Sequence, residues 1–147
     1  MSKQSQIRNM KALAQLLSQP LGYIYGEREC GPNGAKKQFL SKGRAFLSAL
    51  AKDLGLTDYT VRTNPAGIAV SGEATLSGTW PTGRDIYVSI QQMDPELVLL
   101  YRREMGSGQL TVNHFVNLRA LEKGDYDALL DQLRFLNKEA WDGHSAA

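Results

Sequence analysis

Residues 59–104 read YTVRTNPAGIAVSGEATLSGTWPTGRDIYVSIQQMDPELVLLYRRE, and their alternation is the strongest structural signal in the chain. Apolar and polar side chains alternate in four runs, a period of two that is typical of half-buried strands. The runs begin near Tyr59, Ile68, Ile86 and Leu97. Proline and glycine separate the runs and favour turns, because proline fixes one backbone dihedral and glycine permits a positive φ. Four strands joined by short turns predict an antiparallel meander.

The alternation predicts a sheet with one apolar face and one polar face. The polar set, which we expect to face water or a partner, is Arg62, Ser71, Glu73, Thr75, Ser77, Tyr87, Ser89 and Gln91. The fourth strand fits two registers. Either Leu97 and Leu99 face the core, or Val98 and Leu100 do. Either register exposes one arginine, Arg102 or Arg103.

Segments with helical periodicity precede and follow the predicted strands in the sequence. It predicts helices over residues 3–18, 35–54 and 125–140, whereas residues 109–117 are ambiguous. The second helix has the clearest apolar face, and Gly55 is well placed to end it. That face consists of Phe39, Gly43, Phe46, Leu47, Leu50 and Leu54. The pattern therefore predicts an α+β fold, a four-stranded antiparallel meander with helices packed on one face.

Length and composition favour one domain in a reducing compartment. The 147 residues, 42% hydrophobic and 22% charged, exclude disorder and collagen-like repeats. We expect an N-terminal helix and a Gly/Pro-rich loop in residues 1–34, an α-β-β-β-β-α core in 35–140 and a tail in 141–147. The single cysteine, Cys30, excludes an internal disulfide. Without an apolar leader or membrane span, a cytoplasmic location is expected.

Charge is distributed unevenly along the chain. Residues 1–44 carry a net charge of +6 and residues 45–147 a net charge of −4, which favours a polyanionic partner for the basic part. On the second helix, Lys37, Arg44 and Lys52 form an exposed ridge that suits either a phosphate backbone or ordinary solvation. The candidate contacts with nucleic acid are Lys36, Lys37, Lys42, Arg44, Lys52, Arg62, Tyr87, Arg102 and Arg103.

Two aromatic residues are candidate contacts with a protein partner. Trp80 lies in the turn GTWPTG, where it either anchors a partner or folds back over the edge of the sheet. Phe135 points away from the apolar face of the last helix, which suits a partner or homodimer contact. A protein inhibitor or adaptor that binds no nucleic acid is therefore the alternative to a nucleic-acid-binding protein.

Catalytic and metal-binding patterns are weak. His114 and Cys30 are the candidates for a small enzyme, the third hypothesis, but neither has a partner residue nearby in the sequence. The spacing of His, Asp and Glu fits no common metal site. We therefore expect a non-enzymatic protein without metal or cofactor.

Four segments of the chain carry a resemblance to other proteins. They are Asn64-Pro65-Ala66-Gly67, AVSGEATLSG (69–78), IYVSI (86–90) and LLYRRE (99–104). They resemble small accessory proteins of phages and plasmids, over roughly residues 35–135, and include no motif of known chemistry. The resemblance implies an accessory protein of a mobile element. Proteins of that kind often bind or inhibit host nucleic-acid machinery, including anti-defence proteins, so the expected partner is nucleic acid or a host nucleoprotein complex.

Overall fold

The computed structural model describes residues 3–17, 35–65, 72–93, 96–103, 112–118 and 126–137. Its helices are α1 (Lys3–Leu17), α3 (Ala35–Leu54), α4 (Tyr126–Arg134) and the short 3-10 helix η2 (Phe135–Asn137). Its strands are β1 (Asp58–Asn64), β2 (Glu73–Thr79), β3 (Asp85–Met93), β4 (Glu96–Arg102) and β5 (His114–Asn117). The predicted residues Cys30, Ser71 and the tail 141–147 lie outside the described residues.

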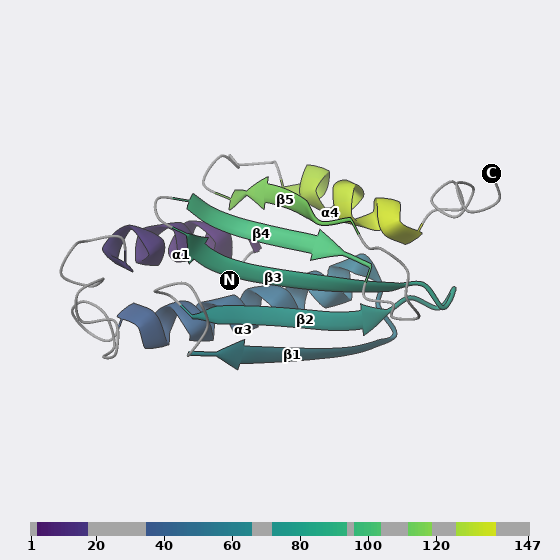
Figure 1. The fold of residues 1–147 in the computed structure, drawn as a ribbon, viewed down its shortest axis with the longest axis horizontal. Coiled ribbons are helices and arrows are strands. Elements are labelled where there is room, and N and C mark those ends of the chain that lie inside the picture. The colour runs from purple at the N-terminus through teal and green to yellow at the C-terminus, as the bar shows by residue number, and fades with distance from the viewer. Residues whose placement is uncertain are drawn as a thin grey trace.

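The strands form one antiparallel sheet in the order β1-β2-β3-β4-β5 (Figure 1). The predicted α+β class and antiparallel meander are confirmed, but the predicted number of strands is wrong because β5 adds a fifth. Only four residues long, β5 shows too few alternations to be recognised from the sequence alone.

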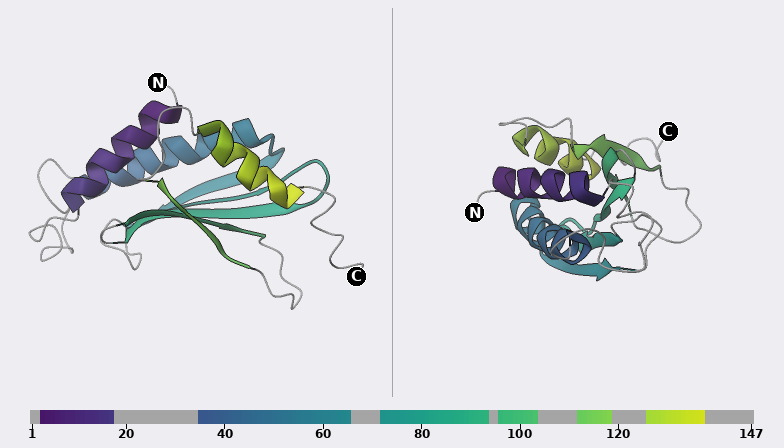
Figure 2. Two further views of the ribbon diagram at one scale, coloured as in Figure 1. Left: turned by 90° about the horizontal axis from the view of Figure 1, so that it is seen from above. Right: turned by 90° about the vertical axis from the view of Figure 1, so that its left-hand side faces the viewer.

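The described helices all lie on one face of the sheet, as predicted (Figure 2). Every residue of the predicted apolar face of α3 is buried. At Gly43 the helix comes close to the sheet: a Cβ there would lie 3.1 Å from Cβ of Ala74 and 3.2 Å from Cδ1 of Ile90. A glycine at this position therefore sets how closely α3 packs on β2 and β3.

The register of β4 is the one in which Leu97, Leu99 and Tyr101 are buried beneath the helices. Arg102 therefore lies on the opposite face of the sheet, since successive side chains of a strand point to opposite sides. Arg103 follows the end of β4 and is half-buried.

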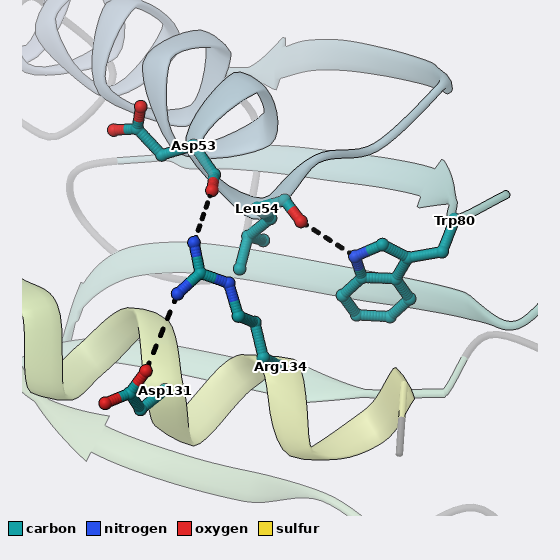
Figure 3. A network of polar contacts seen from close by, with 5 residues as sticks. All are labelled: Asp53, Leu54, Trp80, Asp131 and Arg134. Carbon is teal, nitrogen blue, oxygen red and sulfur yellow. Dashed lines mark hydrogen bonds and ion pairs between the residues drawn. The ribbon is translucent and has the colours of Figure 1, made fainter. Parts of the chain in front are cut away.

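The last four carbonyl groups of α3 all have a hydrogen-bond donor. Gly55, with φ +83°, donates its amide to Lys52, and the amide of Leu56 reaches Ala51, both at 3.1 Å. Side chains satisfy the other two carbonyl groups. Arg134 donates to the Asp53 carbonyl at 2.7 Å, and Trp80 donates to the Leu54 carbonyl at 2.9 Å (Figure 3). Helix ends need such partners because the final carbonyls have none within the helix.

Trp80 is consequently part of the core, with only 3% of its surface exposed. Its indole N–H has a fixed acceptor in the Leu54 carbonyl. The prediction that Trp80 is an exposed anchor for a protein partner is wrong: the ring folds back, and it packs in the core at the end of α3.

Candidate nucleic-acid interface

The face of the sheet away from the helices, here called the open face, is covered by none of the described helices (Figure 2). Two rows of side chains cross its middle, and we call them the central rows. The first row runs through Thr60, Ser77, Tyr87 and Arg102, and the second through Arg62, Thr75, Ser89, Leu100 and Phe115. Adjacent members of a row are cross-strand neighbours on the same face, so their side chains interact directly.

Tyr87 and Arg102 form a cation–π pair in the first central row. The Cζ atom of Arg102 lies 4.5 Å from the centroid of the Tyr87 ring. Nη1 of Arg102 also donates to Oδ1 of Asn113 at 3.4 Å, just before β5. Tyr87 and Arg102, two of the expected nucleic-acid contacts, therefore lie against each other on the open face. Arg103 follows the end of β4 and is not one of the strand residues that form this row.

Phe115 adds an exposed aromatic ring to the open face, beside the half-buried Tyr87, and was not among the residues predicted from the sequence. Its surface is 63% exposed, and its cross-strand neighbour is Leu100. Tyr87 and Phe115 lie two strands apart, a separation of roughly 10 Å between their strands. The signal in the sequence was the single aromatic residue of residues 109–117, but without a register its face was unknown.

Arg62 and Arg102 bring positive charge to the central rows of the open face, and the Glu73 carboxylate reaches the second of these rows at the buried Ser89. Arg62 is exposed and Arg102 half-buried. Asp58 and Asp85 share the row of Thr79 at one end of the sheet. At the other end the acid is Glu73, whose carboxylate accepts a hydrogen bond from the Ser89 hydroxyl at 2.8 Å. The first central row, which contains Arg102 and no acid, therefore suits a polyanion better than the row of Asp58 and Asp85.

The predicted basic ridge of α3 lies in the helix layer, on the other side of the molecule from the open face (Figure 2). Lys37, Arg44 and Lys52 are exposed as predicted, whereas Lys36 and Lys42 are half-buried. The expected nucleic-acid contacts therefore divide into two surfaces that face different directions.

Arg44 connects these two surfaces at the β1 edge of the sheet. Its guanidinium donates to the Val61 carbonyl at 3.4 Å and to Oγ1 of Thr63 at 3.2 Å. Arg62 stands between these two acceptors in the sequence and points to the open face. Two hydrogen bonds to β1 thus fix the position of the Arg44 guanidinium.

The residues proposed for catalysis do not assemble a site within the described part of the chain. His114 lies on the helix-covered side of β5 and stacks on Tyr101, with ring centroids 4.9 Å apart and an angle of 20° between the rings. Within the described ranges, no three His, Cys, Asp or Glu side chains gather closely enough to hold a metal ion. None of the helices described there has the length and hydropathy needed to span a membrane.

Phe135 is the predicted partner contact that does reach the surface. It belongs to η2 and is 44% exposed, whereas the next residue, Leu136, is buried in the core. The helical phase predicted for this segment places the two side chains correctly.

No protein family, curated protein or solved structure matches this chain. Its function is therefore argued from the geometry of the open face.

Proposed function

We propose that this is a non-enzymatic protein that binds single-stranded nucleic acid across the central rows of the open face. The observation that carries the proposal is the Tyr87–Arg102 pair, an aromatic ring and a guanidinium 4.5 Å apart on a face that no described helix covers. The resemblance to accessory proteins of mobile elements supports the same reading, because such proteins often act on nucleic-acid machinery.

Aromatic rings on an open sheet bind bases by stacking. Every base has a π-face, so rings such as Tyr87 and Phe115 accept bases with little dependence on sequence. The planar guanidinium of Arg102 offers a further surface on which a base stacks. The bases of a duplex are stacked on one another and unavailable, so these groups favour an unpaired strand.

Phosphates need cations beside the stacking groups. Arg62 on β1 and Arg102 on β4 lie on opposite sides of β2 and β3, three strands apart, or about 14 Å at the usual strand spacing. Hydroxyl groups of Thr75 and Ser77 lie between them and suit phosphate or sugar oxygens. Several nucleotides are therefore needed to cover this distance.

The experiment is fluorescence anisotropy with a labelled oligonucleotide as single-stranded DNA, single-stranded RNA and duplex DNA, each across a salt series. We expect the single strands to bind more tightly than the duplex. Tyr87→Ala and Phe115→Ala each remove one stacking platform, which costs about 1–3 kcal/mol, or roughly a 5- to 150-fold loss of affinity.

Charge-neutral variants locate the phosphate contacts. Arg62→Gln should lower the slope of log affinity against log salt by about 0.7, the contribution of one phosphate on a single strand. Lys52→Gln on the α3 ridge is the matched control, since it removes the same charge from an exposed residue of the other surface. Absence of binding to every nucleic acid at low salt, or an equal effect of both variants, contradicts the proposal.

A protein partner is the second candidate function, and the exposure of Phe135 favours it. Asp127 and Asp131 on the neighbouring helix α4 are also exposed, although Asp131 makes an ion pair with Arg134 at 3.5 Å. An inhibitor or adaptor of the anti-defence kind would present this acidic helix to a basic host protein. A host partner that survives nuclease treatment, is lost in Phe135→Ala and is kept in Phe115→Ala would support this alternative.

A further inference from the structure

Among the described strands, β1 and β5 form the two edges of the sheet, and the two edges differ in their protection. An edge strand presents backbone N–H and C=O groups that can pair with another chain, so natural proteins protect exposed edges with charges, proline or covering side chains. The two edges therefore differ in how readily another strand could pair with them.

The β1 edge is protected. The α3 side chain Arg44 donates to the Val61 carbonyl and to Oγ1 of Thr63, so a guanidinium occupies a backbone acceptor of this strand. The strand also carries exposed charges at Asp58 and Arg62, and exposed Pro65 follows its end. Each of these features opposes the addition of another strand.

The β5 edge carries no comparable protection within the described residues. Residues 112–118 read VNHFVNL and include no Lys, Arg, Asp, Glu or Pro. No described strand pairs with the outer side of β5. Among the described residues, the large apolar side chains with the greatest exposure are Phe115 at 63% and Val112 at 58%, in this segment.

We infer that β5 pairs antiparallel with β5 of a second copy of this chain, which joins the two sheets into one of ten strands. Two-fold symmetry requires the same patch on both partners and places like residues near the axis. In a register centred on Phe115, the two phenylalanine rings face each other, and Asn113 of each copy lies opposite Asn117 of the other. The uncharged segment 112–118 suits this arrangement because no like charges meet at the axis.

The partner is a second copy because the segment is self-complementary. In this register Phe115 pairs with Phe115 across the axis, and Val116 of each copy pairs with His114 of the other, so each of these cross-strand pairs contains an aromatic or β-branched side chain. A two-fold axis perpendicular to the sheet keeps both open faces on the same side. The dimer would therefore present one continuous surface, but its formation does not depend on the nucleic-acid proposal.

Sedimentation equilibrium of the full chain without nucleic acid tests this inference. We expect a concentration-dependent dimer for the unmodified protein and a monomer for Phe115→Lys, in which two lysines would meet at the axis. Thr60→Lys is the matched control: Thr60 is exposed on the protected edge strand β1 and points to the same face, so this variant should remain a dimer. Phe115 is largely exposed, so its substitution should leave the folded core intact.

Hydrogen exchange provides a second measurement that needs no variant. The amides of His114–Asn117 that point away from β4 should become more protected as protein concentration rises, whereas those of Asp58–Asn64 should not change. A monomer at every concentration overturns the inference, as does a dimer that persists in Phe115→Lys. Concentration-dependent protection confined to β1 would also overturn it, because the wrong edge would then be paired.

Discussion

Replacement of Trp80 by phenylalanine tests how the end of α3 is stabilised. The indole N–H is the donor to the Leu54 carbonyl at 2.9 Å, and the ring is 97% buried. Phenylalanine keeps an aromatic ring in the core but leaves a buried acceptor without its partner, which costs about 1–3 kcal/mol. The smaller ring also loses packing, so the free energy of unfolding should fall by about 2–4 kcal/mol in total.

The measurement is urea unfolding followed by far-UV circular dichroism. The transition midpoint should fall while its slope stays constant, because the surface exposed on unfolding hardly changes. Benzothienylalanine at position 80 separates the two contributions, since it replaces the N–H by sulfur and keeps the shape of the ring. This variant should show the loss of the hydrogen bond alone.

A second donor to the same helix end provides the comparison. Arg134→Met removes the donor to the Asp53 carbonyl but keeps most of the aliphatic side chain. Arg134 is half-buried, so water can replace its hydrogen bond and the expected loss is smaller, about 0.5–1.5 kcal/mol. If the benzothienylalanine protein is as stable as the unmodified protein, the Leu54 carbonyl does not depend on Trp80 and the reasoning is refuted.

Two further predictions concern the stability of the fold. Burial and the hydrogen bond to the Asp53 carboxylate at 2.6 Å raise the pKa of Tyr126 above its usual value. The stabilisation by Tyr126 is therefore present below pH 10, where tyrosine ionises in the unfolded chain, and is lost as the pH rises above 10. Urea unfolding from pH 8 to 11 should show that the free energy of unfolding falls more steeply with pH for the unmodified protein than for Tyr126→Phe. An equal dependence on pH in the two proteins would contradict this. Gly72 and Gly55 both have positive φ, but a Cβ at Gly72 would lie 2.7 Å from the Asn64 carbonyl oxygen, whereas at Gly55 it meets nothing within 4 Å. Gly55→Ala should lower the free energy of unfolding by about 1–2 kcal/mol because alanine disfavours the left-handed backbone, and Gly72→Ala should lower it by more. Thermal unfolding of the two variants checks this ranking, and a larger loss in Gly55→Ala would contradict it.

The sequence was sufficient to predict the layers of the fold because burial imposes the periodicity. The 3.6-residue period of α3 and the alternation of β2 and β3 each follow from one face meeting the core. Neither pattern depends on knowing what lies opposite. The register of β4 could not be predicted in this way, because its leucines suit both faces of the sheet. Only the pairing with β3 and β5 decides that Leu99 is buried.

The direction of Trp80 could not be predicted for a related reason. Its position depends on the Leu54 carbonyl, 26 residues earlier in the chain, which becomes an unsatisfied acceptor only once α3 has ended beside the sheet. A tryptophan in a turn has the same local sequence whether it faces water or such an acceptor. The face of the sheet on which Phe115 lies could not be predicted either. In a strand of four residues the sequence pattern is too short to show which side chains are buried, and pairing with the neighbouring strand decides it.

The distribution of charge along the chain also differs from its distribution in space. The basic first third of the sequence suggested that residues of α3 bind a polyanion, yet these residues lie in the helix layer and Arg44 is held by the β1 edge. The cations of the open face, Arg62 and Arg102, come from the part of the sequence with net negative charge. A charge count by segment therefore identifies the wrong surface if the open face is the binding site. The paired variants Arg62→Gln and Lys52→Gln separate these possibilities, because each removes one positive charge, from the open face in the first and from the helix layer in the second.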